Sequence, residues 1–251
     1  MPESDAMDDT TDHAVPSGFS ISDEVRLYAV GDIHGRADLL EKINRKIDAH
    51  LDSNACARHL RIFLGDYVDR GPDSRSVIEG LVAIEQRGEA VFLRGNHETF
   101  IAEFISNPAV LPVWRSLGGL ETLASYGVLS PLNPDPEHQL RLAAEFSAAL
   151  PPSHVQFLGR LRPCFAFDDV FFAHAGVRPG VPFASQSETD LFWIRDEFLQ
   201  HRRLFEKLVV HGHTPVRAPD VQPNRINIDT GAYVTGQLTC LWIQGTRMGF
   251  L

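Results

Sequence analysis

Five short polar motifs hold the residues of this sequence that are best suited to chemistry. In chain order they are Gly31-Asp32-Ile33-His34-Gly35, Gly65-Asp66-Tyr67-Val68-Asp69-Arg70-Gly71, Gly95-Asn96-His97-Glu98, Ala173-His174-Ala175-Gly176 and His211-Gly212-His213-Thr214. Their Asp, Asn and His side chains supply oxygen and nitrogen atoms, which are ligands for manganese, iron and zinc. Because the set contains no sulfur, a closed structural zinc site is disfavoured.

Six residues of these motifs form one candidate metal centre, namely Asp32, His34, Asp66, Asn96, His174 and His213. One aspartate can bridge two cations, and two cations about 3.5–4 Å apart can hold the attacking and leaving oxygens of a phosphoryl transfer. Such cations also make hydroxide available from water at neutral pH. The pattern therefore predicts two divalent metal ions per chain, with Mn²⁺ preferred over Fe or Zn, and hydrolysis of phosphate esters.

Apolar runs predict the elements that must position the motifs. Strands are expected over 25–30, 59–64 and 90–93, with helices over 37–51 and 73–87 between them. This alternation is typical of a parallel or mixed sheet covered by helices, in which ligands gather outside the carboxyl ends of the strands. Each motif follows a strand directly, so the sheet would bring the motifs together.

The second half of the chain reads as a helical segment followed by strands. Residues 99–161 are expected to be mainly helical, with breaks at prolines, and a helix is expected over 190–199. A second group of strands is expected at 164–167, 170–173, 208–210, 225–228, 237–243 and 247–250. We predict one α/β domain with two sheets, because polar motifs follow strands in both halves.

The charge of −10 over 251 residues is unevenly distributed. Residues 1–24 hold seven acidic and no basic residues, which predicts a flexible acidic leader ahead of a catalytic domain over 25–251. That domain has 26 of the 33 acidic residues against all 23 basic ones, a difference of −3. The acidic balance disfavours nucleic acid as a partner, and the absence of long apolar runs disfavours a membrane. We therefore expect a cytoplasmic protein; the sequence predicts no oligomeric state.

The motifs also resemble a known family. The first three, with His174 and Gly212-His213-Thr214, resemble the signature of the PPP-type serine/threonine phosphatases, within the calcineurin-like metallophosphoesterase superfamily. Residues 228–232 and 236–239 resemble the C-terminal strands of the bacterial and phage branch. The resemblance covers about residues 25–245 and implies a sandwich of two mixed β-sheets flanked by helices, with a helical insertion at about 99–161.

The resemblance implies a metal ligand set in this sequence. Asp32, His34 and a bridging Asp66 would hold one ion. The other ion would be held by the same Asp66 and by the remaining three candidates, Asn96, His174 and His213. Spacing alone leaves His211 and His213 as alternatives. Alignment with the family motif makes His213 the ligand and places His211 beside the ligands or the phosphate.

The resemblance also implies the catalytic roles. A hydroxide bridging the metals would attack phosphorus in line, and His97 would protonate the leaving oxygen as general acid. Asp69 would hold the ring of His97 and favour its protonated form. Arg70 and Arg195 would bind the substrate phosphate through charge-assisted hydrogen bonds. For Tyr233, contact with substrate and simple packing in a loop remain alternatives.

The main prediction is a phosphoprotein phosphatase that hydrolyses phosphoserine or phosphothreonine, with a phosphoprotein or phosphopeptide as its partner. The nearest alternative is a symmetrical diadenosine tetraphosphate hydrolase, because relatives with that activity share the metal centre. Those relatives resemble Gly-Asp-x-Val-Ala-Arg-Gly and Gly-Asn-His-Asp, whereas this chain has Asp69 and Glu98, which favours the protein phosphatases. A non-catalytic phospho-binding module on the same fold is a third alternative, disfavoured because every expected ligand is present.

Overall fold

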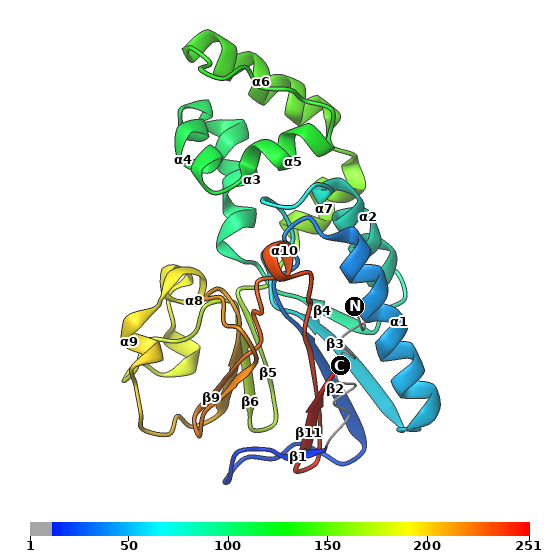
Figure 1. Cartoon of the computed structure of the whole chain (residues 1–251). Coiled ribbons are helices and arrows are strands. Elements are labelled where there is room, and N and C mark those ends of the chain that lie inside the picture. The colour runs from blue at the N-terminus through cyan, green and yellow to red at the C-terminus, as the bar shows by residue number, and fades with distance from the viewer. Residues whose placement is uncertain (1–11) are drawn as a thin grey trace, which may run out of the picture.

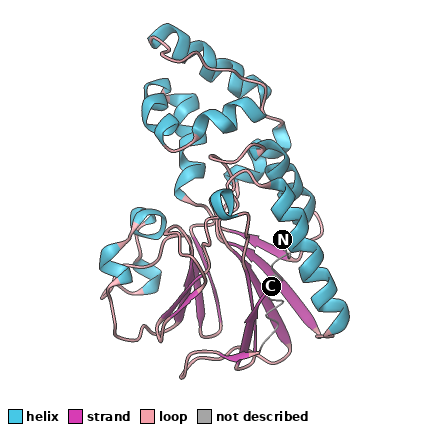
Figure 2. Cartoon of the chain, viewed as in Figure 1, coloured by secondary structure: helices cyan, strands magenta, loops and turns pink. Residues whose placement is uncertain are grey.

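Two β-sheets lie face to face, with helices on their outer sides and a helical layer above them (Figures 1 and 2). The computed structural model describes residues 12–251. Both sheets combine parallel and antiparallel neighbours. The predicted α/β class with two mixed sheets flanked by helices is confirmed.

The first sheet has six strands in the described residues, in the order β1-β11-β10-β2-β3-β4. These strands are β1 (His13–Ala14), β11 (Arg247–Phe250), β10 (Cys240–Gln244), β2 (Val25–Val30), β3 (Arg58–Phe63) and β4 (Ala90–Phe92). The neighbours β2, β3 and β4 are parallel, and the other pairs are antiparallel. Two crossover helices, α1 (Ala37–Ser53) and α2 (Ser74–Glu85), connect the parallel strands.

The second sheet has the order β5-β6-β7-β9-β8. Its strands are β5 (Cys164–Phe167), β6 (Val170–Ala173), β7 (Leu208–His211), β9 (Arg225–Asn227) and β8 (Asp220–Val221). The central strands β6, β7 and β9 are parallel, so their carboxyl ends lie at one edge. On the outer face, a 3-10 turn (Phe183–Ser185), α8 (Glu188–Trp193) and α9 (Asp196–Leu199) contribute to a separate apolar cluster with β6 and β7.

Side chains that point alternately to the two faces of the first sheet contribute to two separate apolar cores. Leu27 of β2 and Ile62 of β3 share one cluster with Phe172 and Val210 of the other sheet. Their neighbours Tyr28 and Phe63 belong instead to the cluster that includes the helices. Successive side chains of a strand point to opposite faces, so one sheet supplies both cores. The buried apolar residues between the sheets fix the distance between the two sets of strand ends.

Helices between β4 and β5 form the insertion above the sheets. They are α3 (Asn96–Ser106), a 3-10 turn (Pro108–Val110), α4 (Leu111–Ser116), α5 (Gly119–Ser125), α6 (Pro136–Ala149) and α7 (Pro152–Gly159). Proline stands in the first turn of α6 and α7, where its missing N–H leaves no helical hydrogen bond unmade. Trp114, Phe104 and Phe146 are buried against one another, which gives the insertion an apolar centre.

The leader predicted over 1–24 is wrong for residues 12–24, which are part of the fold. Strand β1 pairs with β11, and Val15, Phe19 and Ile21 are buried in the cluster between the sheets. The backbone N–H of Ser20 donates to Asp169 in the turn between β5 and β6 of the second sheet. The prediction rested on the acidic composition of residues 1–24 as a whole, so these apolar positions were not recognised. The remainder of the predicted leader, 1–11, lies outside the described residues.

The grouping of the last two strands was also wrong. Strands β10 and β11 join the first sheet, where β10 pairs antiparallel with β2. Local apolar pattern predicts that a strand exists but carries no information on its distant partner. The helix expected over 190–199 is interrupted at Ile194 and Arg195, which separate α8 from α9. A short helix, α10 (Ala232–Thr235), precedes β10.

None of the helices in residues 12–251 combines the length and apolar character needed to cross a membrane.

Phe19→Ala should lower the free energy of unfolding by about 3 kcal/mol, the usual cost of emptying a buried phenylalanine site. Urea denaturation of the full chain measures this change. Ser17→Ala, at an exposed position of the same segment, is the matched control and should change stability by less than about 0.5 kcal/mol. Equal stability of the two variants would show that the segment contributes nothing to the fold.

Candidate metal centre

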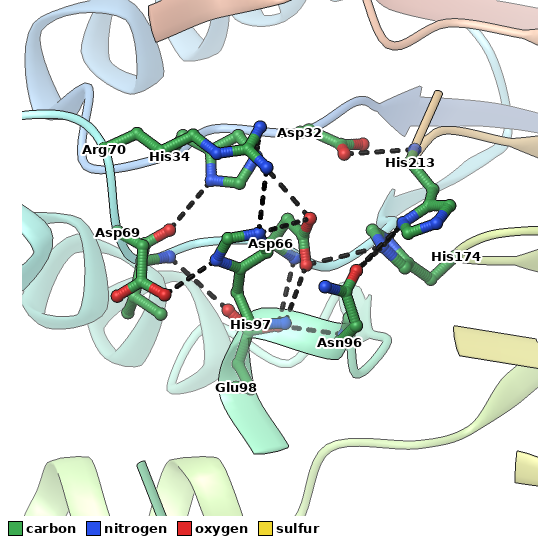
Figure 3. Close-up of polar contacts among 12 residues, drawn as sticks. Asp32, His34, Asp66, Asp69, Arg70, Asn96, His97, Glu98, His174 and His213 are labelled. Atoms are coloured by element: carbon green, nitrogen blue, oxygen red, sulfur yellow. Dashed lines mark hydrogen bonds and ion pairs between the residues drawn. The ribbon is translucent and has the colours of Figure 1, made fainter. Parts of the chain in front are cut away.

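All six candidate ligands follow strand ends at the edge where the two sheets meet (Figure 3). Strands β2, β3 and β4 present Asp32 with His34, Asp66, and Asn96, whereas β6 and β7 present His174 and His213. Each side chain belongs to a residue that is at most 5% exposed. The structure therefore brings together the polar residues that sequence analysis selected from both halves of the chain.

The loops that carry these residues have an unusual backbone. His34, Asp66 and His213 all have positive φ, at 46°, 51° and 65°. Such left-handed conformations are costly for residues other than glycine and concentrate at functional sites. Two glycines permit close approach of the carboxylates, since a Cβ on Gly95 would lie 2.2 Å from Asp66 Oδ1 and one on Gly212 would lie 2.0 Å from Asp32 Oδ1.

Asp66 lies between two groups of potential ligands. Its Oδ2 is 3.5 Å from His34 Nε2, and its Oδ1 is 3.3 Å from His174 Nε2. The described residues include two clusters able to hold a metal ion, and both contain Asp66. One adds His34 and His97, and the other adds His174 and His213. A carboxylate shared by two clusters has the position required of a bridging ligand.

The second cluster is completed by Asn96. Its Oδ1 lies 3.0 Å from His174 Nε2 and 2.9 Å from His213 Nδ1, and these two ring nitrogens are 3.2 Å apart (Figure 3). Second contacts fix the rings, because His174 Nδ1 lies 3.1 Å from the Leu64 carbonyl oxygen. Three lone-pair-bearing atoms thus converge on one point, an arrangement that suits a cation.

Asp32 provides a further test of whether a cation fits. Its Oδ2 accepts the backbone N–H of His213, but its Oδ1 is buried without a hydrogen-bond partner. A buried carboxylate oxygen without a partner is costly unless a cation binds it. Burial, together with the nearby carboxylate of Asp229, raises the pKa of Asp32 well above its usual value. The donor set of this chain therefore fits divalent cations.

The histidine pKa values agree with ligand chemistry in part. Burial lowers the pKa of His34 to about 3 and that of His213 to about 2, so both rings are neutral at pH 7, as metal ligands must be. For His174, burial acts in the same direction, but the Asp66 and Asp32 carboxylates raise the pKa to about 9. A cation between these carboxylates would compete directly with the proton on His174.

His97 and Asp69 form a buried pair beside the cluster. His97 Nδ1 is 2.7 Å from Asp69 Oδ2, while His97 Nε2 faces Asp66 Oδ2 at 3.8 Å. Burial lowers the pKa of His97, but the Asp66 and Asp69 carboxylates outweigh it and raise the pKa above its usual value. The pair has the geometry of a general acid whose ring is oriented by a carboxylate.

Asp69 is itself held by residues of the insertion that sequence analysis did not select. Trp114 Nε1 donates to Asp69 Oδ2 at 2.9 Å, and Thr122 Oγ1 donates to Asp69 Oδ1 at 2.6 Å. These residues lie on α4 and α5, about 50 positions from Asp69. The sequence carried no signal for them, because an isolated Trp or Thr in a helical stretch matches ordinary packing.

The two candidate phosphate-binding arginines contact different ligands. Arg70 Nη1 lies 3.1 Å from His34 Nε2, and its Nη2 lies 3.1 Å from His97 Nε2. Arg195 donates through Nε to His213 Nε2 at 3.1 Å. Both guanidinium groups therefore reach the metal clusters, where planar donors can bind phosphate oxygens.

His211 lies outside this arrangement. Its Nδ1 is 3.1 Å from the Gly212 carbonyl oxygen, its Nε2 has no hydrogen-bond partner, and the Phe198 ring packs against it. Burial lowers its pKa to about 3. Among the described residues, no hydrogen bond or ion pair links His211 to the candidate ligands. The role predicted for it beside the ligands or phosphate has no support in these contacts.

Glu98 organises the loops, a role that sequence analysis missed. Its Oε2 accepts the backbone N–H groups of Gly95 and Asp66, and its Oε1 accepts that of Tyr67 at 2.7 Å. The side chain thereby ties the loop after β3 to the start of α3. Glu98 stands at the third position of α3 and accepts the N–H of the N-cap residue Gly95, which is the half of a capping box that needs no N-cap side chain.

Comparison with known proteins identifies the family. Residues 25–238 match the model of the calcineurin-like phosphoesterases, and the chain belongs to this family. It is a hydrolase of the phosphoesterase type, and its structure provides clusters that could bind the divalent metals used by the family. This confirms the predicted superfamily.

Individual relatives carry a more specific name. An asymmetrical bis(5'-nucleosyl)-tetraphosphatase PrpE from Anoxybacillus flavithermus is 29% identical, over 84% of this chain and 88% of its own length. A protein of the same name from Bacillus thuringiensis is 30% identical over 84% of this chain and 88% of its own length. These names differ from the protein-phosphatase branch that the motifs had predicted.

Solved structures share the fold. The crystal structure of a provisionally assigned diadenosine tetraphosphatase matches with a TM-score of 0.63 and 20% identity, covering 95% of this chain and 98% of the other. A serine/threonine phosphatase from Saccharomyces cerevisiae matches with a TM-score of 0.53 and 15% identity, covering 88% and 73%. At these identities the matches establish the architecture alone.

Thr122→Val should lower kcat by about tenfold with little change in metal content, because Asp69 loses the hydroxyl that orients it toward His97. Steady-state kinetics and elemental analysis of the same preparations measure both quantities. Thr189→Val makes the same chemical change at an exposed position of α8 and should leave kcat unchanged. Unchanged kcat in both variants would contradict a positioning role for Thr122.

Proposed function

We propose that this protein hydrolyses dinucleoside tetraphosphates in a metal-dependent reaction. The observation that carries the proposal is the match to bis(5'-nucleosyl)-tetraphosphatases over 84% of the chain, at 29–30% identity. The predicted ligands, His97 and both arginines lie together, which supports an active enzyme over a non-catalytic binding module. The names of the relatives favour asymmetrical cleavage, to a mononucleotide and a nucleoside triphosphate.

The two residues that had favoured a protein phosphatase both have their carboxylates engaged within the protein. Asp69 is fully buried, and its carboxylate is occupied by His97, Trp114 and Thr122. Glu98 is also buried and accepts backbone N–H groups of two loops. Protein groups occupy both carboxylates, so neither is positioned to contact the group that carries the phosphate.

The proposed reaction assigns a task to each side chain. Asp32, His34, Asp66, Asn96, His174 and His213 would hold two divalent cations, with Mn²⁺ the first candidate and Fe or Zn the alternatives. Bound there, the cations would neutralise charge on phosphate oxygens and activate water. Arg70 and Arg195 would bind oxygens of the phosphate under attack.

The proton in this reaction comes from the buried pair. As a hydroxide oxygen bonds to phosphorus, the bond to the departing phosphate oxygen would break, and His97 Nε2 would give that oxygen its proton. Asp69 would stabilise the protonated ring through Nδ1. General acid catalysis matters most for poor leaving groups. The presence of this acid therefore also supports the second candidate substrate, a phosphoserine or phosphothreonine ester, whose leaving group is an alkoxide.

Diadenosine tetraphosphate should be hydrolysed with a kcat/KM at least tenfold above that for a phosphoserine peptide, because the named relatives act on such nucleotides. The assay uses the full chain with Mn²⁺, and chromatography identifies the products. AMP with ATP would indicate asymmetrical cleavage, and two ADP would indicate the symmetrical reaction.

Chelator provides the control for that assay and should abolish turnover of both substrates. Preferred hydrolysis of the phosphopeptide would contradict the proposed nucleotide substrate and return the assignment to the protein phosphatases. Turnover that persists in excess chelator would contradict the metal-dependent mechanism.

Two conservative variants should separate metal binding from proton transfer. Asp66→Asn removes the shared carboxylate charge and should lower both bound Mn²⁺ and kcat. His97→Asn should retain the metal and lower kcat by about 100-fold on the phosphopeptide, with a smaller loss on the nucleotide, because polyphosphate is the better leaving group. Elemental analysis with kinetics measures these changes; full Mn²⁺ occupancy in Asp66→Asn would contradict the bridging role.

A further inference from the structure

A recess of about 610 Å³ opens beside Arg70, outside the cluster of candidate ligands. Its walls are formed on one side by residues 115–118 and 120–121, which run from the end of α4 into α5, and on the other by Tyr233 of α10. The volume falls within the range of about 300–1,000 Å³ typical of pockets for small organic ligands. A single phosphate group at the metal centre would leave most of this space unfilled.

Arg70 connects the recess to the candidate centre. Its guanidinium nitrogens lie 3.1 Å from His34 Nε2 and from His97 Nε2, and its Cζ lies over the Tyr233 ring, 4.8 Å from the ring centre. The Tyr233 ring also packs edge-on against His34, with centroids 5.3 Å apart. A substrate whose phosphate is held by Arg70 would therefore extend directly into the recess.

The backbone around the recess fixes Arg70 relative to the wall. The Arg70 N–H donates to the Gly118 carbonyl oxygen at 3.1 Å, and Gly118 has a φ of 95°. A Cβ at Gly118 would lie 2.6 Å from the Arg70 nitrogen. Glycine at 118 is thus required for the two backbone segments to approach this closely. The contact fixes the position of Arg70 relative to the wall of the recess.

The lining combines positive charge with flat and apolar surface. Arg70 and Arg115 outnumber the single acidic side chain, Glu121. Tyr233 adds an aromatic ring with the Arg70 guanidinium over it, and Leu117 with Leu120 adds half-buried aliphatic surface. This combination suits a ligand that joins a planar base to phosphate groups, since bases stack on aromatic rings and arginines bind phosphates.

We propose that this recess binds one nucleoside of the substrate, with the base against Tyr233 and the neighbouring phosphates at Arg70 and Arg115. The identity of the natural ligand rests on the proposed function, hydrolysis of dinucleoside tetraphosphates. The recess would give a nucleotide an affinity advantage over a ligand that offers phosphate alone.

The test compares AMP and inorganic phosphate as competitive inhibitors of p-nitrophenyl phosphate hydrolysis by the Mn²⁺-loaded full chain. AMP should inhibit the wild type at least about fivefold more strongly, because a stacked base adds affinity that phosphate alone lacks. Ser116→Trp places a bulky ring at an exposed position of the wall and should remove this advantage. Val113→Trp adds the same ring to α4 outside the recess and should retain it.

A second pair of variants tests the recess independently, in case Ser116→Trp does not fold. Arg115→Ala should weaken inhibition by AMP more than inhibition by phosphate. Arg141→Ala, on the exposed face of α6 and away from the recess, should change neither. Denaturation midpoints of all four variants identify any that are destabilised.

Two failures are distinguishable. Equal inhibition of the wild type by AMP and phosphate, or an AMP advantage that survives in Ser116→Trp and Arg115→Ala, would overturn the recess as a nucleotide site. An AMP advantage that these variants remove, in a wild type that does not cleave diadenosine tetraphosphate, would support the site and overturn the proposed function instead.

Discussion

The structure depends on the burial of several carboxylates in one small volume between the sheets. Asp32, Asp66 and Glu98 are each at most 5% exposed, yet only Glu98 has its charge spread over several backbone N–H groups. Burial raises its pKa to about 7, with the Asp66 charge acting in the same direction. The carboxylate of Asp66 has His34 and His174 as its nearby positive or polar partners, and Oδ1 of Asp32 has no hydrogen-bond partner. Divalent cations would satisfy this cluster, because buried negative charge requires a close positive partner.

This requirement explains why both sheets and the insertion are needed. The first sheet contributes the carboxylates, and the second contributes His174 and His213 from parallel strands that end at the same edge. The insertion then supplies Trp114 and Thr122, which hold the carboxylate beside His97. The insertion therefore has two tasks, since it holds the carboxylate beside the proposed general acid and also forms one wall of the recess beside Arg70.

Sequence reasoning succeeded where the signal was local. Asp32, His34 and Asp66 stand directly after apolar strands, so one short stretch of sequence reveals both the end of the strand and the candidate ligand. Spacing alone left His211 and His213 open, and the family motif favoured His213; in the structure His211 ends β7, whereas His213 stands in the turn that follows. Phe19 escaped notice because acidic neighbours dominated its segment. Substrate could not be predicted from Asp69 and Glu98, because their partners are protein groups that only the folded chain brings near.

The central claim is that one buried carboxylate, Asp66, is shared by two cations. Anomalous diffraction from Mn²⁺-soaked crystals tests it most directly. The account predicts two manganese peaks per chain, about 3.5–4 Å apart, on either side of Asp66. One peak should lie beside Asp32 and His34, and the other beside Asn96, His174 and His213. A single peak, or a peak beside His211, would contradict the account.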